Sequence, residues 1–332
     1  MKSPLDFIPS RRRFFETLAG AAAASMGATA LSAEQSVSQA APRRSRVVVV
    51  RDPAAMGRDN RPIRKTLGSM LERGLCLLTG ESAASSAWLK IISPTAIVGL
   101  KVNCLGGPTL CTHPALAEIV ADSLAAAGIS PEKITLWDRN DAELERCGFR
   151  INKNGAGARC FGTPAYEPDT IRVAGVTTRL STLVTRETTA MIALPVLKAH
   201  TLAGFSGALK NELGCVQNPM DFHGDACRGA GDVCALDAIA KKRRLVICDA
   251  LRPLYDKGPT DMPRYRWNQG ALILATDPVA ADLVGRSILE EKRKAIAGGK
   301  PWPLLPPPIH LDRAIELGLG AKSLDGVELV EA

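Results

Sequence analysis

Apolar and polar positions follow two distinct patterns along the chain. Short, continuous apolar runs rich in β-branched residues predict strands that are buried on both faces of a sheet. These runs lie at 43–53, 95–103, 133–138, 189–197, 245–250 and 270–277. Segments with apolar residues three or four positions apart predict amphipathic helices. The helical segments lie at 61–74, 113–128, 206–214, 231–244 and 277–295.

Strands that alternate with helices are typical of an α/β domain. We therefore expect a mostly parallel sheet, covered by helices on both faces, in a domain over residues 43–332. Residues 139–188 interrupt the alternation with several glycines and prolines, and they predict an irregular excursion from the sheet. Gly74 is expected to end the first helix, because glycine is common just after a helix C-terminus.

Residues 1–33 have the pattern of an export signal. Arg11 and Arg12 precede Phe14 and Phe15, and an alanine-rich apolar run with small residues follows. This run is too short and too weakly apolar for a transmembrane helix, so no stable membrane insertion of the mature protein is expected. Paired arginines are typical of twin-arginine signals. We therefore expect a periplasmic or otherwise exported protein that folds in the cytoplasm and engages the twin-arginine translocation machinery.

Composition argues against several classes of site. The formal charge of +8 is spread along the chain, and the one dense basic run, 241–244, has no aromatic residues between its cations. No nucleic-acid binding is therefore expected. None of the nine cysteines forms a C-x-x-C pair, so neither an iron–sulfur cluster nor a zinc ribbon is expected. Cys104 and Cys111 flank a glycine–proline loop and could form a disulfide in an oxidising compartment.

Polar residues follow several of the predicted strands. In parallel α/β sheets, ligands bind beyond the carboxyl ends of the strands. The candidates at these ends are Lys101, Asn103, Asp138, Lys198, His200, Asp249 and Asp277. Asp138 and Asp277 are interpreted as helix caps or turn residues. The others predict a polar site at the carboxyl edge of the sheet.

The segment 196–214, VLKAHTLAGFSGALKNELG, carries the most informative pattern. Gly204 and Gly207 permit a tight bend, and Ser206 is placed to cap a helix that contains Lys210. Unpaired N–H groups at such a bend attract anions. The expected substrate- or anion-binding residues are Lys101, Asn103, Lys198, Ser206, Gly207 and Asn211.

Two of the four histidines flank Lys210 in the sequence, His200 before it and His223 after it. Imidazoles can transfer protons near neutral pH or ligate a divalent metal ion. His200, His223 and Lys210 are therefore the expected catalytic residues, and the two histidines are also candidate metal ligands. His113 is interpreted as a capping or exposed residue, and His310 as part of a surface helix.

With these residues in place, the chain resembles the family catalogued as domain of unknown function 362. The resemblance lies in IVGLKVN (97–103), LPVLKAHTLAGFSGALKNELG (194–214), DFHGD (221–225), LVICDAL (245–251) and ATDPVAAD (275–282). Some members of that family carry a ferredoxin-like cysteine cluster, which this chain lacks. The resemblance therefore implies no iron–sulfur centre here.

A second resemblance is to the nickel-dependent lactate racemases, in which a histidine, a glycine–serine–glycine turn and a lysine hold a nickel-pincer nucleotide. His200, the bend at 204–207 and Lys210 follow in the same order here, and His223 could match a further histidine. The proline–glycine that usually follows the lysine is replaced by NELG, and paired histidines are absent. This resemblance therefore names no cofactor for the chain.

The expected function is that of an enzyme with a strand-end site for a small anionic substrate. Two histidines suited to proton transfer favour this function. A periplasmic ligand- or cofactor-binding protein without catalysis is one alternative. A racemase-like isomerase that uses a bound metal cofactor is another. The sequence names no substrate, metal or reaction.

Overall fold

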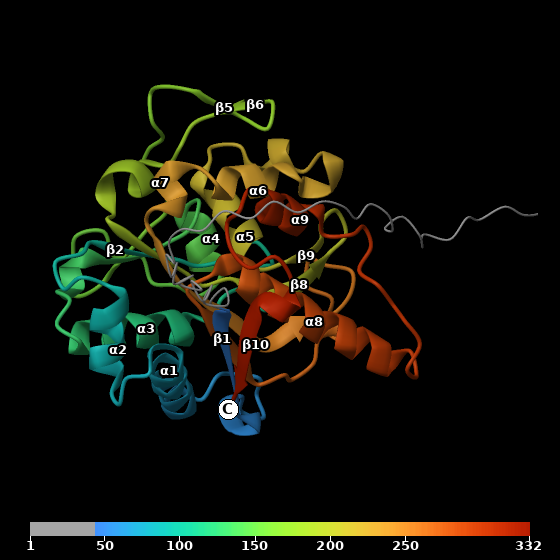
Figure 1. Ribbon diagram of the computed structural model, residues 1–332. Coiled ribbons are helices and arrows are strands. Elements are labelled where there is room, and N and C mark those ends of the chain that lie inside the picture. Colours follow the sequence, from blue (N-terminus) through green and yellow to red (C-terminus); the bar gives the residue numbers. More distant parts are fainter. Residues whose placement is uncertain (1–43) are drawn as a thin grey trace, which may run out of the picture. The chain divides into compact units, whose positions relative to one another are not determined.

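The computed structural model describes residues 44–332, and the predicted export signal lies outside them. A ten-stranded sheet forms the centre of the described part (Figure 1). Its strands are β1 (Ser45–Arg51), β2 (Val98–Lys101), β3 (Ile134–Trp137), β4 (Arg159–Cys160), β7 (Ala190–Ala193), β8 (Val196–His200), β9 (Gly204–Ser206), β10 (Arg243–Leu254), β11 (Ala271–Ala275) and β12 (Val327–Glu331). The main order is β12-β1-β11-β10-β7-β2-β3-β4, with β8 beside β10 and β9 beside β8.

Parallel pairing dominates this sheet. Strands β2, β3, β4, β7, β8 and β10 pair in parallel with one another, as do β1 and β12. Strand β11 is antiparallel to both β1 and β10, and β9 is antiparallel to β8. The predicted mostly parallel sheet is therefore confirmed.

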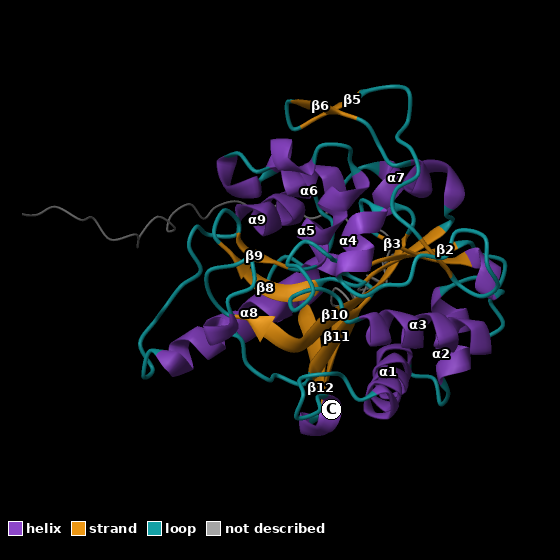
Figure 2. Ribbon diagram, turned by 180° about the vertical axis from the view of Figure 1, so that it is seen from behind, coloured by secondary structure: helices purple, strands orange, loops and turns teal. Residues whose placement is uncertain are grey.

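Helices cover both faces of the sheet (Figure 2). On one face lie α1 (Arg64–Thr79), α2 (Ala84–Ile91) and α3 (Pro114–Ala126), and on the other lie α5 (Ala208–Asn211), α6 (Gly229–Cys234), α8 (Pro278–Ile296) and α9 (Ile309–Glu316). Side chains of a strand alternate between the two faces. In β1, Val48 and Val50 pack in the first core, whereas Val47 and Val49 pack in the second. Burial on both sides explains why this strand is continuously apolar.

Residues 139–188 form the predicted excursion, except that β4 within them joins the main sheet beside β3. They contain the short helix α4 (Asp141–Arg146), a separate hairpin of β5 (Ile171–Val173) and β6 (Val176–Thr178), and a π-helical turn, Leu183–Glu187. The hairpin extends away from the main sheet in Figure 1. A third apolar core, which includes Trp137 and Leu183, joins this region to the sheet.

Two helix predictions need correction. The first helix does not end at Gly74 but continues to Thr79 and ends at Gly80, which has a φ of 78°. Gly74 lies inside the helix. Glycine occupies this position because a Cβ there would come within 2.7 Å of Leu274 on the sheet. The predicted helix over 231–244 is interrupted, since α6 ends at Cys234 and α7 covers only Asp237–Ala240.

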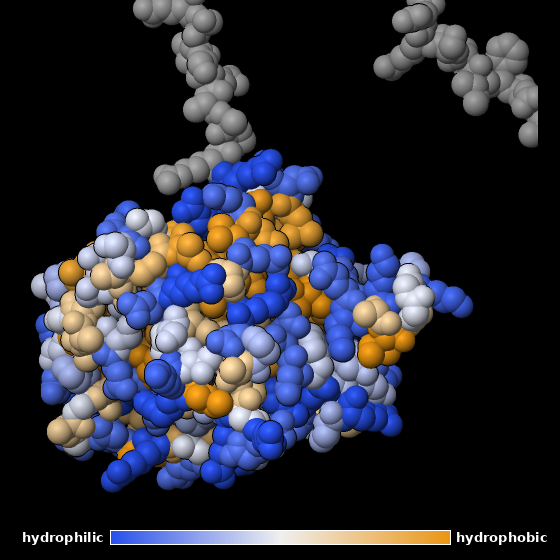
Figure 3. All heavy atoms as spheres, turned by 90° about the horizontal axis from the view of Figure 1, so that it is seen from below, coloured by the Kyte–Doolittle hydropathy of each residue, from blue (hydrophilic) through white to orange (hydrophobic). Residues whose placement is uncertain are grey.

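Within residues 44–332, none of the helices has both the length and the apolar character needed to cross a membrane. The face shown in Figure 3 is largely hydrophilic, with smaller apolar areas between the polar side chains.

Candidate functional site

The site lies where the chain changes its strand partner, between β7 and β8. Strand β7 pairs with both β2 and β10, but after Leu194 the chain leaves β2 and continues as β8 along β10. The Leu194 N–H still donates to the Lys101 carbonyl oxygen at 2.8 Å, and the Asp249 N–H donates to Pro195 at 2.8 Å. Beyond Leu194, the chain no longer pairs with β2, and polar side chains lie next to the end of β2 on this side.

A buried chain of hydrogen bonds joins β2, β8 and α5. The Lys198 ammonium donates to Asn103 Oδ1 at 2.8 Å, and Asn103 Nδ2 donates to Asn211 Oδ1 at 3.1 Å. Asn211 Nδ2 in turn donates to the Lys101 carbonyl oxygen at 3.1 Å. Burial lowers the pKa of Lys198 to about 8. Four predicted site residues are therefore brought into one network.

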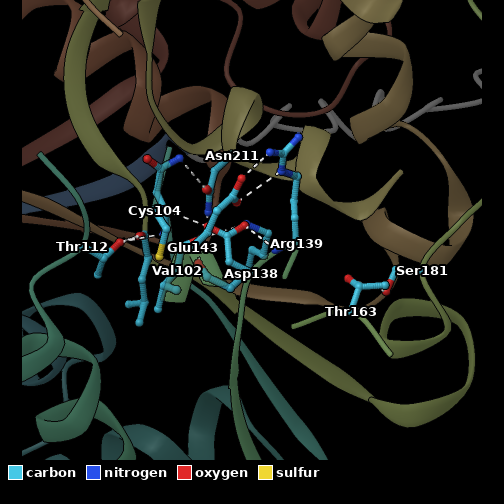
Figure 4. Close-up of polar contacts among 12 residues, drawn as sticks. Val102, Cys104, Thr112, Asp138, Arg139, Glu143, Thr163, Ser181 and Asn211 are labelled. Atoms are coloured by element: carbon cyan, nitrogen blue, oxygen red, sulfur yellow. Dashed lines mark hydrogen bonds and ion pairs between the residues drawn. The ribbon is translucent and has the colours of Figure 1, made fainter. Parts of the chain in front are cut away.

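Lys101 and Asp138 form a buried ion pair next to this network, with Nζ and Oδ1 2.7 Å apart. The Asp138 carboxylate also accepts from the backbone N–H groups of Cys104, at 2.7 Å, and Arg139, at 2.9 Å. Figure 4 shows Asp138 with Cys104, Arg139 and Asn211, apart from the Thr163–Ser181 contact. Asp138 is thus part of the site and not only the turn residue that its position suggested.

Lys210 and His223 are in direct contact, with Nζ 2.9 Å from Nε2. His223 Nδ1 lies 3.0 Å from the Pro219 carbonyl oxygen, which requires a hydrogen on Nδ1. His223 Nε2 is then the acceptor for the Lys210 ammonium. Burial lowers the pKa of Lys210, and burial together with Lys210 lowers the pKa of His223. The pair can therefore pass a proton between two groups whose charged forms are both disfavoured.

A cavity of about 60 Å³ lies at this contact. The predicted site residues among its lining are Lys101, Asn103, Lys210, Asn211 and His223. Asp138, Arg139 and Glu143 also line it, and Arg139 forms an ion pair with Glu143. The volume is enough for a few water molecules or one small polar group.

His200 lies close to His223, with ring centroids 5.7 Å apart, but it does not line this cavity. The His200 Nδ1 accepts from the Leu202 N–H at 3.1 Å, and His223 Nε2 is taken by Lys210. Within residues 44–332, no cluster of three or more metal-ligating side chains is suitably placed. The role of the two histidines as metal ligands therefore stays a prediction.

The glycine bend differs from the prediction. The N–H groups of Ala208 and Leu209 donate to the Asp282 carboxylate of α8, at 2.6 and 3.0 Å. Ser206 makes no capping hydrogen bond to α5, and neither Ser206 nor Gly207 lines the cavity. The bend thus has an internal carboxylate where an external anion was expected.

Three further residues were missed or misplaced by sequence reasoning. Asp282 lies on the buried side of an apolar helix segment, PVAAD, and the only signal was an aspartate among apolar neighbours. His310 is completely buried and packs against Phe205, with ring centroids 5.3 Å apart, rather than lying on a surface helix. His113 is also not free, because its Nδ1 lies 2.7 Å from Asp249 Oδ2.

The sequence matches the family described as Domain of unknown function (DUF362) over residues 98–287. No curated protein matches the sequence. A solved protein from Thermotoga maritima is 11% identical with a TM-score of 0.41, over 70% of this chain and 59% of that chain. The lactate racemase apoprotein from Thermoanaerobacterium thermosaccharolyticum is 12% identical with a TM-score of 0.40, over 74% of this chain and 57% of that chain.

This chain spans less than two-thirds of the length of either solved structure. The family match, in contrast, spans more than half of this chain and includes Lys101, Lys210 and His223. This protein therefore belongs to the DUF362 family.

Proposed function

We propose that this protein is an enzyme that binds a small anionic substrate at the carboxyl edge of the sheet and transfers a proton through Lys210 and His223. The observation that carries this proposal is the 2.9 Å contact between Lys210 Nζ and His223 Nε2 in the wall of a cavity. A lysine whose pKa is lowered by burial is suited to general acid–base catalysis. The imidazole beside it can accept or return the proton.

The balance of charge supports an anionic substrate. Lys101 is paired with Asp138, and Arg139 is paired with Glu143. Lys210, in contrast, lines the cavity and contacts an imidazole, and within residues 44–332 it is not ion-paired with a carboxylate. Lys198 lies deeper, outside the cavity lining, where it contacts the Asn103 amide oxygen. Buried cations without a counter-ion attract an anion strongly, because the low dielectric screens them little.

Proton exchange with solvent tests this proposal without knowledge of the natural substrate. Small carboxylates and phosphorylated compounds are incubated with the protein in D₂O, and proton NMR follows the loss of C–H signals. We expect exchange in at least one compound, and His223→Gln should slow it by about 100-fold or more. The exposed Lys300→Met variant is the matched control and should exchange at the native rate.

Other outcomes of this experiment would support one of the alternative functions. A compound that binds tightly but exchanges no proton would contradict the enzyme and support a binding protein without catalysis. Exchange with inversion of configuration would identify an isomerase. Exchange that persists unchanged in both His223→Gln and Lys210→Met would contradict the proposed residues.

We propose further that the protein is exported by the twin-arginine route, on the basis of Arg11, Arg12 and the apolar run after them. Replacing both arginines with lysine should leave precursor in the cytoplasm. Fractionation of cells that express each form, followed by immunoblotting, provides the measurement. Normal accumulation of the double variant outside the cytoplasm would contradict this route.

A further inference from the structure

Two large apolar side chains lie at the mouth of the cavity that Lys210 and His223 line. Leu105 and Met220 also line this cavity, and yet 48% of Leu105 and 63% of Met220 is exposed. A single exposed apolar side chain on a protein surface needs no explanation. These two come from different loops, one after β2 and one just before His223, and meet at the same cavity. The site therefore has an apolar mouth.

Met220 is on the same side of its turn as His223. It belongs to the 3₁₀ turn Pro219–Phe222, which His223 follows with a near-helical backbone. The His223 N–H donates to the Met220 carbonyl oxygen at 3.0 Å. Side chains three residues apart eclipse one another in a 3₁₀ turn. Met220 thus lies next to the imidazole that contacts Lys210.

Leu105 is held at the cavity by an anchored loop. Its neighbour Cys104 packs in the first apolar core and donates its N–H to Asp138 at 2.7 Å. The residues on either side of Cys104, which are Asn103 and Leu105, both line the cavity. The loop therefore presents an apolar side chain beside the amide that belongs to the buried network.

The interior of the cavity has the opposite character. Lys101 is paired with Asp138, and Arg139 with Glu143, so these four charges balance. Of the charged residues in the wall, Lys210 alone has no carboxylate partner within residues 44–332. Only 6% of Lys210 is exposed, and the volume of about 60 Å³ holds one small polar group. Any larger ligand must extend through the mouth, where Leu105 and Met220 lie.

We infer that the substrate is a carboxylic acid with an alkyl or aryl part, whose carboxylate enters the cavity towards Lys210 while the apolar part lies against Leu105 and Met220. The inference rests on the proposed function, because it takes Lys210 as the group that attracts the anion, and it adds the class of substrate. A carboxylate is the smallest of the common organic anionic groups and suits the small interior. Methionine suits the mouth, since its flexible side chain adapts to apolar ligands.

Calorimetric titration of the full chain with butanoate and hexanoate tests this inference. The two acids have the same anionic group and differ by two methylene groups. Full burial of one methylene group raises affinity about fourfold, and half burial about twofold. We therefore expect hexanoate to bind the native protein about 4- to 16-fold more tightly than butanoate.

Two variants test where the apolar part lies. Met220→Gln and Leu105→Asn each replace an exposed side chain by a polar one of similar size, so both are expected to fold. Each should reduce the preference for hexanoate to about twofold or less. Leu324→Asn is the matched control, because Leu324 is 49% exposed but does not line the cavity, and it should keep the native preference. Thermal melts check that each variant is folded.

Three results would overturn the inference. The first is equal affinity of the native protein for the two acids, with weaker binding of both by Lys210→Met. In that case the proposed function would stand and the substrate would lack an apolar part. The second is a preference for hexanoate that persists in both Met220→Gln and Leu105→Asn, which would place the apolar part elsewhere. The third is no binding of either acid with a Kd below about 10 mM.

Two further measurements separate this inference from the proposed function. Native affinity of Lys210→Met for both acids would contradict the inference and the proposed function together. If neither acid binds the native protein, the proton-exchange experiment still decides the proposed function, because it uses other carboxylates and phosphorylated compounds.

Discussion

At the scale of single residues, His310 shows that the core around Phe205 holds a polar side chain whose burial costs free energy. Its ring is completely buried, and neither ring nitrogen has a hydrogen-bond partner among residues 44–332. Burial, with a smaller effect of Lys210, lowers the pKa of His310 to about 3. A histidine in the unfolded chain titrates near a pKa of about 6.5. Folding therefore requires His310 to be neutral over a wide acidic range.

This difference predicts the effect of acid on stability. Between about pH 3 and about pH 6.5 the unfolded chain binds a proton at His310 that the folded protein does not, so the free energy of unfolding falls as the pH falls. The slope from one such group is at most about 1.4 kcal/mol per pH unit. His310→Leu should therefore gain stability relative to the native protein on going from about pH 7 to about pH 4.5. Urea denaturation at both pH values measures this, and an equal difference at the two would contradict it.

At the scale of elements, a contact with α8 positions the short helix α5. Four residues do not form a stable helix alone. The Asp282 carboxylate accepts the first two N–H groups of α5, and a Cβ on Gly207 would lie 2.1 Å from Asp282 Oδ1. Glycine at 207 is therefore needed for this close approach. The position of Lys210 depends on the contact.

Asp282→Asn tests this dependence with almost no change in volume. The amide keeps one acceptor oxygen but turns an NH₂ group towards the other backbone N–H, which is then buried without a partner. We expect a loss of about 1–3 kcal/mol in the free energy of unfolding, measured by urea denaturation. The exposed Asp325→Asn variant is the control and should change stability little. Native stability in Asp282→Asn would show that Asp282 does not position α5.

The sequence predicted the strand-end residues because their position follows from local pattern. Lys101 and Lys198 come from buried apolar runs, and parallel strands bring such residues to one edge. The roles of Asp282 and His310 could not be predicted, because each lies on a helix whose buried face depends on distant packing. The same reason applies to Gly74, which looks like a helix end in the sequence but is a close contact with the sheet.

At the scale of the whole molecule, long-range pairing determines the order and direction of the strands, which the periodicity of the sequence does not. The apolar runs predicted most of the central strands, but not that β11 lies antiparallel between β1 and β10. Strand β12 joins the edge beside β1 although it was not predicted, since its sequence VELVE is short and neither continuously apolar nor regularly alternating. The state of the cysteines likewise did not follow from the sequence pattern. All nine are free, and Cys104 does not pair with Cys111.

The thiols provide a test of this whole-molecule packing. Eight of the nine cysteines are buried, and Cys76 is partly exposed. We expect no more than one thiol to react quickly with a chromogenic disulfide reagent in the folded protein, and nine to react after denaturation without reductant. Seven reactive thiols after denaturation would instead indicate a disulfide, such as the Cys104–Cys111 pair that the sequence left open.

We expect Lys210 to serve the function of the site and not the stability of the fold. Burying its ammonium costs free energy, and methionine offers a similar length without that cost. The most direct measurement is the free energy of unfolding of Lys210→Met near pH 7, obtained by urea denaturation beside the native protein. We predict that it equals or exceeds the native value. A decrease of more than about 1 kcal/mol would mean that Lys210 holds the fold together, and would contradict the claim.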